Sequence, residues 1–226
     1  MASKYAGTTK MATKVHICDY GSGNILSVER ALEKVGAEVV RCTSPEQLQD
    51  VKGLIIPGVG AFADCMRGVR ERGFERPIHQ LVEQGKWVLG ICVGMQILAT
   101  RSEEFGMTDG LDIVPGTVKQ LPDIAPDGSR LKRPHVGWSE LQRRSQPWEG
   151  SPLEQIDEGT AAYFVHSFHL VPDDPKHLLA DASYVGTPVH AAVRRGRVFG
   201  VQFHPEKSGR TGLAFLDGFL KLVQTA

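Results

Sequence analysis

Two short segments of the chain are apolar at every position, and they limit the possible folds more than any other feature. Residues 53–56 read Gly-Leu-Ile-Ile, and residues 87–91 read Trp-Val-Leu-Gly-Ile. A strand with one face in water alternates apolar and polar side chains, whereas a strand buried on both faces does not. Each segment is followed by a stretch whose apolar residues have helical spacing. This combination predicts parallel strands covered by helices on both sides.

The alternation of strand and helix holds for the first half of the chain and then changes. Residues 15–18 form a short apolar strand, and residues 25–35 place their apolar side chains on one helical face. After about Gly110, proline and glycine become frequent and short β segments replace the helices. Residues 189–203 have the pattern of a β-hairpin, and residues 211–223 that of a final helix.

A single domain is expected to account for most of the chain. The polar start, rich in small residues, predicts a disordered tail over residues 1–13. Residues 14–226 are expected to form one α/β domain with a mostly parallel central sheet, helices on both faces and added antiparallel β structure. With 226 residues, 41% of them hydrophobic, the chain is long enough to bury a core without disulfides or metal.

Charge and cysteine content argue against several kinds of partner. Lysine plus arginine equals aspartate plus glutamate at 26 each, so no net charge attracts nucleic acid or an anionic membrane. No apolar run has the length of a membrane span, and the start has no signal-peptide core. The four cysteines form no CxxC pair. We therefore expect a cytoplasmic protein that binds neither nucleic acid nor membrane.

The most informative motif is Gly90-Ile91-Cys92-Val93-Gly94, a G-x-C-x-G between a buried strand and a helix. It is the thiol counterpart of the G-x-S-x-G nucleophile elbow. Such a turn is strained, and larger side chains at the glycine positions would collide with neighbouring backbone. The turn also places the sulfur at a helix N-terminus, which favours the thiolate. Cys92 is the predicted nucleophile, although a structural cysteine beside packing glycines has the same local pattern.

A candidate base follows another strand, in Phe203-His204-Pro205-Glu206. A cysteine nucleophile needs a base, and the imidazole needs a partner that fixes its tautomer and stabilises its charged form. Proline restricts the backbone between His204 and Glu206, and residues two apart in extended chain share a side. Glu206 can then hold one ring nitrogen while the other faces Cys92. Taken alone, the pair can also be a solvated histidine beside a surface glutamate.

Residues 89–96 (LGICVGMQ) and 201–206 (VQFHPE) together resemble the class-I, or triad, glutamine amidotransferases. The resemblance implies a flavodoxin-like three-layer sandwich that hydrolyses L-glutamine to glutamate and ammonia with a Cys92–His204–Glu206 triad. Further segments resemble the glutaminase subunits of imidazole glycerol phosphate synthase, an enzyme of histidine biosynthesis. They are residues 19–24 (DYGSGN), 57–60 (PGVG), 134–138 (PHVGW), 163–168 (YFVHSF) and 206–209 (EKSG).

The resemblance implies roles for other residues as well. The oxyanion and substrate-binding residues would be Gly58, Val59, Gly60, Gln96, Ser167 and Phe168. Backbone N–H groups near Gly58 and Val59 would face the tetrahedral intermediate, and each such donor can lower the barrier by about 3 kcal/mol. Purely structural alternatives are an ordinary β-turn for residues 57–60 and a buried amide satisfied by backbone for Gln96.

The implied partner is a (β/α)₈ cyclase subunit that receives ammonia across the interface in a heterodimer. Asn24, Trp138 and Lys207 are the expected docking residues, although a tryptophan is more often a core residue. A peptide beside glycine rotates at small cost, so an oxyanion donor in residues 57–60 can point away at rest and turn inward when the partner is liganded.

We assign no metal and no cofactor. On a strand, the spacing of His166 and His169 sends their rings to opposite faces. The glycine-rich turn 19–24 lacks both the last glycine of G-x-G-x-x-G and the lysine of a P-loop. Three other functions stay open: the glutaminase component of anthranilate or GMP synthesis, a stand-alone γ-glutamyl hydrolase, and a binding relative that has lost activity.

Overall fold

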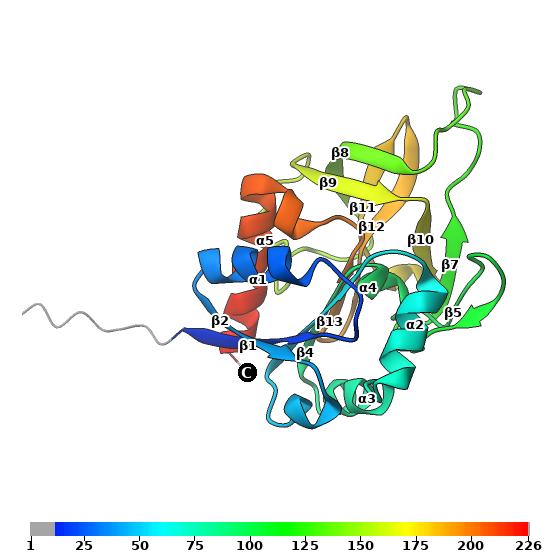
Figure 1. Ribbon diagram of the computed structural model, residues 1–226. Coiled ribbons are helices and arrows are strands. Elements are labelled where there is room, and N and C mark those ends of the chain that lie inside the picture. Colours follow the sequence, from blue (N-terminus) through cyan, green and yellow to red (C-terminus); the bar gives the residue numbers. More distant parts are fainter. Residues whose placement is uncertain (1–11, 226) are drawn as a thin grey trace, which may run out of the picture.

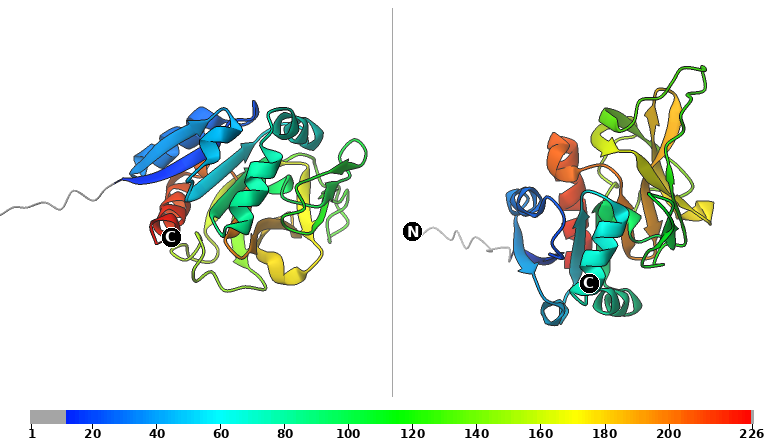
Figure 2. Two further views of the ribbon diagram at one scale, coloured as in Figure 1. Left: turned by 90° about the horizontal axis from the view of Figure 1, so that it is seen from below. Right: turned by 45° about the vertical axis from the view of Figure 1, so that its right-hand side comes forward.

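The computed structural model describes residues 12–225 (Figure 1). A disordered tail was predicted for residues 1–13, and residues 1–11 of it lie outside the described residues. Thr13 is not part of a tail, because it begins the first strand. Helices α1 (Ile25–Lys34) and α5 (Gly209–Gln224) cover one face of a large sheet. Helices α2 (Phe62–Glu71) and α3 (Glu75–Glu83) cover the other, as Figures 1 and 2 show. Within residues 12–225, no helix combines the length and apolarity that a membrane span requires.

The central sheet is parallel in one half and antiparallel in the other. In spatial order its strands are β2 (Ala37–Cys42), β1 (Thr13–Cys18), β3 (Gly53–Gly58), β4 (Trp87–Cys92), β13 (Val198–Val201), β12 (Thr187–Arg195), β11 (Leu178–Tyr184), β8 (His135–Arg143) and β9 (Ala161–His166). Neighbours from β2 to β13 are parallel, and those from β13 to β9 are antiparallel. The added antiparallel strands thus continue the parallel sheet, and β12–β13 is the predicted hairpin.

A smaller sheet lies beside the large one. Its strands, in spatial order, are β10 (Phe168–Pro172), β7 (Gly116–Gln120), β5 (Arg101–Ser102) and β6 (Thr108–Asp109). Short 3₁₀ turns complete the architecture at η1 (Pro45–Leu48), η2 (Pro175–His177) and η3 (Pro205–Lys207).

The two segments that are apolar throughout are the buried parallel strands that the sequence predicts. Every residue of β3 and β4 is buried, and Leu54, Ile55 and Leu89 have no exposed surface. Burying one such side chain contributes about 1.5–3 kcal/mol to folding. Burial of these strands therefore contributes strongly to the stability of the scaffold that carries the site.

One predicted helix is shorter than expected. The pattern after Cys92 predicts a helix through Leu98, but α4 spans only Val93–Gln96. Backbone N–H groups of residues 111–114 donate to the carbonyls of Ile97, Leu98 and Ala99. The N–H groups of Leu98 and Ala99 donate to Met95 O and Gln96 O, three residues back, so the α-helical bonding ends and the chain turns toward residues 111–114.

Strand order places the ligand site. The chain moves outward from β1 to β2 and then returns across β1 to β3. In open α/β sheets, ligands bind outside the carboxyl ends of the strands at such a reversal. The loops that leave β3 and β4 lie at this edge, and they carry residues 57–60 and Cys92.

Candidate active site

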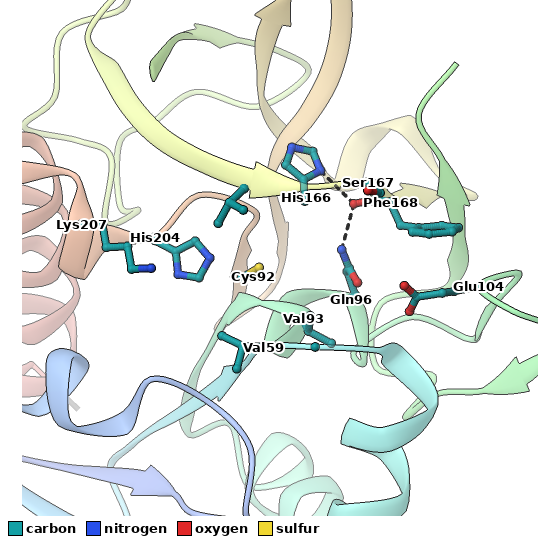
Figure 3. A pocket seen from close by; sticks show the side chains of 12 residues that line it. Val59, Cys92, Val93, Gln96, Glu104, His166, Ser167, Phe168, His204 and Lys207 are labelled. Carbon is teal, nitrogen blue, oxygen red and sulfur yellow. Dashed lines mark hydrogen bonds between the residues drawn. The ribbon is translucent and has the colours of Figure 1, made fainter. Parts of the chain in front are cut away.

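A cavity of about 300 Å³ opens at the carboxyl edge of the parallel strands (Figure 3). Its lining comes from the ends of β3, β4, β9 and β13 and from the loop after β5. The lining residues are Val59, Gly60, Cys92, Val93, Gln96, Glu104, Val165, His166, Ser167, Phe168, His204 and Lys207. Segments far apart in the sequence therefore meet at one hollow, and most of the predicted site residues are among them.

Cys92 occupies a strained turn, as the G-x-C-x-G pattern predicts. Its φ is 55° and its ψ is −114°, an unusual backbone conformation for a residue other than glycine. A Cβ on Gly90 would lie 2.4 Å from Gly94 O, and one on Gly94 would lie 1.8 Å from Ile56 O. Both glycines are thus required by close backbone packing, which holds the strained turn in place and presents the Cys92 thiol to the cavity.

His204 lies between Cys92 and Glu206. Its Nδ1 is 2.8 Å from Glu206 Oε1, and the two side chains are 3% and 1% exposed. Cys92 is close enough to the ring to raise its pKa. The backbone that joins His204 to Glu206 is the 3₁₀ turn η3, not the extended chain expected from the sequence. Ser208 Oγ closes this turn by donating to His204 O at 2.7 Å. The pairing survives because a tight turn also brings residues two apart together.

The charge state of His204 follows from these partners. Burial alone lowers the pKa of His204, because a charged ring loses hydration. Hydrogen bonds and charge interactions with Cys92 and Glu206 outweigh burial and raise the pKa to about 9. At neutral pH the ring therefore favours the imidazolium form, which can donate a proton to a leaving group.

Two glutamine side chains connect the nucleophile to the far wall of the cavity. Gln96 Nε2 donates to Phe168 O at 2.9 Å and to Gln202 Oε1 at 3.0 Å. Gln202 Nε2 in turn lies 3.6 Å from Cys92 Sγ. Gln202 was not predicted as a site residue. It precedes His204 by two positions at the end of a strand, so the shared-side argument applied to Glu206 also points to it.

A chain of hydrogen bonds behind the cavity holds the same Phe168 carbonyl. His166 Nδ1 lies 2.9 Å from Phe168 O, and its Nε2 lies 3.3 Å from His135 Nδ1. His135 Nε2 lies 3.0 Å from Ser139 Oγ. Burial lowers the pKa of His135 to about 4 and that of His166 to about 3, so both rings are neutral at physiological pH.

The tautomers of His135 and His166 follow from the carbonyl at the end of this series of hydrogen bonds, Phe168 O. A carbonyl only accepts, so His166 Nδ1 carries the proton and His166 Nε2 accepts from His135 Nδ1. His135 Nε2 is then an acceptor as well, and it takes the Ser139 hydroxyl proton. All three hydrogen bonds point toward Phe168 O and fix the position of the Ser167–Phe168 segment.

Glu104 is a cavity residue that the sequence did not indicate. Its Oε2 accepts from Phe62 N at 2.6 Å, at the start of α2, and the side chain lines the cavity near Gln96 (Figure 3). A carboxylate beside a helix N-terminus is held by backbone donors and by the helix dipole. Nothing in the local sequence around Glu104 marks it, because its role depends on contact with α2.

Comparison with known proteins decides the family. The family model for class-I glutamine amidotransferases matches residues 16–222. The chain belongs to this family. The predicted resemblance is thereby confirmed, and the protein is a glutamine-hydrolysing enzyme.

The curated relatives of this amidotransferase are similar over nearly the whole chain. Imidazole glycerol phosphate synthase subunit HisH 1 of Legionella pneumophila (strain Paris) is 43% identical over 212 residues, which cover 93% of this chain and 100% of that protein. The HisH subunit of Geobacillus sp. (strain WCH70) is 43% identical, with coverage of 93% and 97%. That of Geobacter sulfurreducens is 41% identical, with coverage of 92% and 98%.

Solved structures support the fold of the amidotransferase. A crystal structure of a glutamine amidotransferase has a TM-score of 0.69 at 21% identity and covers 94% of this chain and 100% of that one. The structure of PurLQS from Thermotoga maritima has a TM-score of 0.69 at 21% identity, with coverage of 95% and 99%. The predicted flavodoxin-like α/β sandwich is confirmed.

The three expected docking residues of the amidotransferase are all at least partly exposed to solvent. Lys207 is exposed and lines the cavity directly. Trp138 is 56% exposed, which removes the alternative that it belongs to the core, and it lies edge-on to Tyr163. Asn24 is half-buried at the start of α1.

The other three cysteines, and the histidines His166 and His169, have structural contacts within the protein. Cys18, Cys42 and Cys65 are buried free thiols in the core of the amidotransferase. His166 and His169 lie on different strands, and His169 Nδ1 accepts from His190 N at 3.0 Å. Each histidine of the pair thus has its own protein partners.

Proposed function

We propose that the chain is the glutaminase subunit of an imidazole glycerol phosphate synthase, with Cys92, His204 and Glu206 as its catalytic residues. The observation that carries this proposal is the strained Cys92 turn beside a histidine whose Nδ1 is held by Glu206 at 2.8 Å, at a small cavity. Full-length similarity to HisH proteins supports the choice of reaction.

In the first half of the reaction, the Cys92 thiolate attacks the side-chain carbonyl carbon of glutamine. A carbon–sulfur bond forms, and the carbonyl oxygen becomes an oxyanion that backbone N–H groups of residues 58–60 stabilise. When the intermediate collapses, the carbon–nitrogen bond breaks and His204 donates its proton to the departing nitrogen, which leaves as ammonia. The product on the enzyme is a γ-glutamyl thioester.

In the second half, neutral His204 takes a proton from water as the water attacks the thioester carbon. The carbon–sulfur bond breaks, glutamate leaves, and Cys92 returns as the thiolate facing the imidazolium. Glu206 keeps its hydrogen bond to His204 Nδ1 in both halves, so the other ring nitrogen always faces the reacting atoms.

The other cavity residues suit the two ends of the substrate. Glu104 offers a carboxylate to the α-ammonium group of glutamine, because only one of its oxygens accepts from Phe62 N. Gln96 has its amide nitrogen bound to protein, which leaves its amide oxygen to accept from the ligand. The backbone of Ser167 and Phe168, held by the histidine chain, completes the pocket.

A second subunit follows from the chemistry of ammonia. In water at neutral pH ammonia is mostly ammonium, which has no lone pair and cannot act as a nucleophile. A (β/α)₈ cyclase subunit docked over Asn24, Trp138 and Lys207 would receive ammonia without contact with bulk water. The four free cysteines are consistent with a reducing compartment, and we place the enzyme in the cytoplasm.

Two alternatives share the same triad and are separated by the partner. A glutaminase component of anthranilate or GMP synthesis would require a different synthase. A stand-alone γ-glutamyl hydrolase would need no partner at all. Similarity to HisH subunits over more than nine-tenths of the chain favours the cyclase-linked enzyme.

The test is the glutaminase rate of the full chain with and without the cyclase subunit from the same organism and imidazole glycerol phosphate. We expect slow hydrolysis by the isolated chain and a rate on the order of a thousandfold higher in the liganded complex, equivalent to a barrier about 4 kcal/mol lower. A fast rate for the isolated chain that the cyclase does not change would favour the stand-alone hydrolase and refute the proposal.

A further inference from the structure

The oxyanion strand, residues 57–60, is held from behind by side chains that line no part of the glutamine cavity. Tyr20 Oη donates to Pro57 O at 2.6 Å. Two residues further along the strand, Val59 O accepts from Ser22 Oγ at 2.8 Å and from Cys65 Sγ at 3.5 Å. Two peptides of this short strand therefore have side-chain hydrogen bonds to their carbonyls.

The direction of the Val59 carbonyl determines where the next N–H points. In a trans peptide the C=O and the N–H point in opposite directions. Val59 O points toward Ser22, and Ser22 lines a second hollow of about 460 Å³ behind the strand. Val59 and Gly60 line this hollow and also the glutamine cavity. The Gly60 N–H therefore points away from Ser22, and the other hollow that Gly60 lines is the glutamine cavity, which also contains Cys92.

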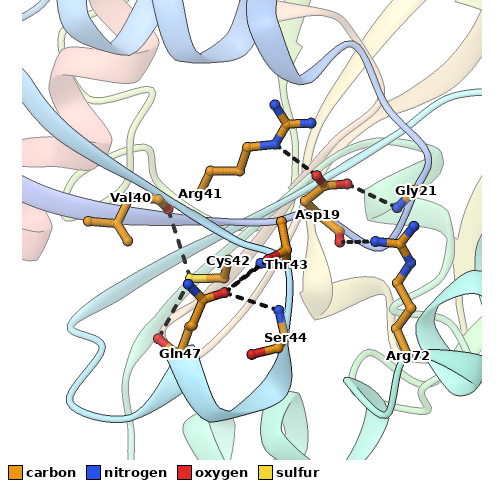
Figure 4. Close-up of polar contacts among 9 residues, drawn as sticks. All are labelled: Asp19, Gly21, Val40, Arg41, Cys42, Thr43, Ser44, Gln47 and Arg72. Carbon is orange, nitrogen blue, oxygen red and sulfur yellow. Dashed lines mark hydrogen bonds and ion pairs between the residues drawn. The ribbon is translucent and has the colours of Figure 1, made fainter.

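The loop that carries Tyr20 and Ser22 is itself firmly held (Figure 4). Arg41 Nε binds Asp19 Oδ2 at 2.7 Å, and Asp19 Oδ1 accepts from Gly21 N at 3.1 Å. Arg72 Nη1 donates to Asp19 O at 3.2 Å. A Cβ on Gly23 would lie 3.0 Å from Pro57 Cβ, so the loop also packs directly on the strand. We call the three side chains that hold the oxyanion strand, Tyr20, Ser22 and Cys65, the anchor. The loop that carries the first two is thus part of the scaffold rather than of a mobile surface.

Cys65, the third residue of the anchor, stays a hydrogen-bond donor throughout the physiological pH range. Cys65 has no exposed surface, and burial raises the pKa of its thiol, so the group stays protonated. Its sulfur also lies 3.4 Å from Ser22 Oγ, which joins the two donors into one unit. The middle peptide, Gly58–Val59, differs from its neighbours. Within the described part of the chain, no side chain donates a hydrogen bond to its carbonyl oxygen, Gly58 O.

We propose that Ser22 and Cys65 are positioning residues that hold the Val59–Gly60 peptide with its N–H toward Cys92, as a preset oxyanion donor. Rotation that depends on the partner is then confined to the Gly58–Val59 peptide. The inference rests on the proposed function, because an oxyanion donor matters only if Cys92 attacks a carbonyl. It assigns a purpose to two side chains that do not touch the substrate.

The experiment is steady-state glutamine hydrolysis by the full chain in complex with the cyclase subunit and imidazole glycerol phosphate. Loss of a whole oxyanion donor costs about a hundredfold or more in kcat, so a donor that is only misaligned should cost less. We expect Ser22→Ala to lower kcat about tenfold and Cys65→Ala about threefold, with KM within about twofold of wild type. Cys65→Ser, which keeps a donor, should recover most of the loss.

Control variants distinguish a specific effect of Ser22 and Cys65 on the oxyanion donor from a general loss of folding. Arg67→Ala removes an exposed side chain that lines the same rear hollow and pairs with Asp64, and it should leave kcat unchanged. Melting temperatures of all variants show whether folding is affected. An unchanged or raised kcat in Ser22→Ala, or no recovery in a folded Cys65→Ser, would overturn the inference. A wild-type complex that does not hydrolyse glutamine would overturn the proposed function itself.

Discussion

Cys92 and His204 reach each other across most of the sequence, and each sits on a turn that its own neighbours determine. Packing of Gly94 against Ile56 O leaves Cys92 little alternative to its strained conformation. Ser208 fixes the turn that brings Glu206 to His204. At this scale the sequence was informative, because an elbow and a His-Pro-Glu turn are local features. Glu104, which it did not reveal, acts through contact with the distant helix α2, whereas Gln202 does carry a local signal, its position two residues before His204.

The raised pKa of His204 predicts a pH dependence of stability. A histidine whose folded pKa of about 9 lies above its ordinary value of 6.5 contributes stability that is complete below 6.5 and lost as the pH rises through 9. The melting temperature of wild type should therefore exceed that of His204→Gln near pH 6 by several degrees, and the difference should shrink toward pH 10. The control is His79→Gln, on α3. A difference that grows with pH would contradict the assigned ion pair.

At the scale of elements, the predicted and observed structures agree where apolar residues follow a regular spacing or where a turn residue separates two strands. The buried strands β3 and β4 and the hairpin β12–β13 follow directly from apolar runs and a turn. The length predicted for α4 was wrong because Leu98 N and Ala99 N donate three residues back, and the carbonyls that follow α4 pair with residues 111–114. No local pattern reports that contact. The histidine chain was equally hidden, since it requires β8 and β9 to pair in the observed register.

The junction between β3 and α4 predicts a large effect of a small substitution. Gly94→Ala places a Cβ 1.8 Å from Ile56 O, so the elbow must shift or the protein must unfold. We expect a loss of more than about 3 kcal/mol in the free energy of unfolding, together with loss of glutaminase activity. Gly186→Ala is the matched control, with a φ of 73° but open space, and should cost only about 1 kcal/mol. Equal losses in chemical denaturation would contradict the packing argument.

The pairing of β8 with β9 predicts that Ser139 influences glutamine binding from outside the cavity. Ser139→Ala leaves His135 Nε2 without its donor and loosens the chain that ends at Phe168 O. A lost hydrogen bond of about 1 kcal/mol should raise KM for glutamine roughly fivefold, with kcat little changed. Ser139→Asn can still donate and should restore KM. Steady-state kinetics of the complex checks this, and a fall in kcat at constant KM would show that the chain has another role.

At the scale of the whole molecule, the site opens toward the surface where the partner is proposed to dock. Val59 and Lys207 line the mouth of the cavity, and Trp138 lies 3.9 Å from where a Cβ on Gly209 would stand, two residues beyond Lys207. Ser22, which holds Val59 O, is two residues before Asn24. The proposed catalytic residues, residues 57–60 and the proposed docking residues are therefore neighbours in sequence or in space. A partner docked there could both change the conformation of residues 57–60 and keep bulk water away from the released ammonia.

The most direct test of a glutaminase that feeds a separate synthase is the Cys92→Ala variant in complex with the cyclase subunit. Cyclase product is measured with glutamine as nitrogen source and, in parallel, with ammonium salt at high pH. The account predicts that glutamine-dependent synthesis falls to background, whereas ammonia-dependent synthesis stays close to that of wild type. Glutamine-dependent synthesis that persists in Cys92→Ala would contradict the assignment of Cys92 as the nucleophile.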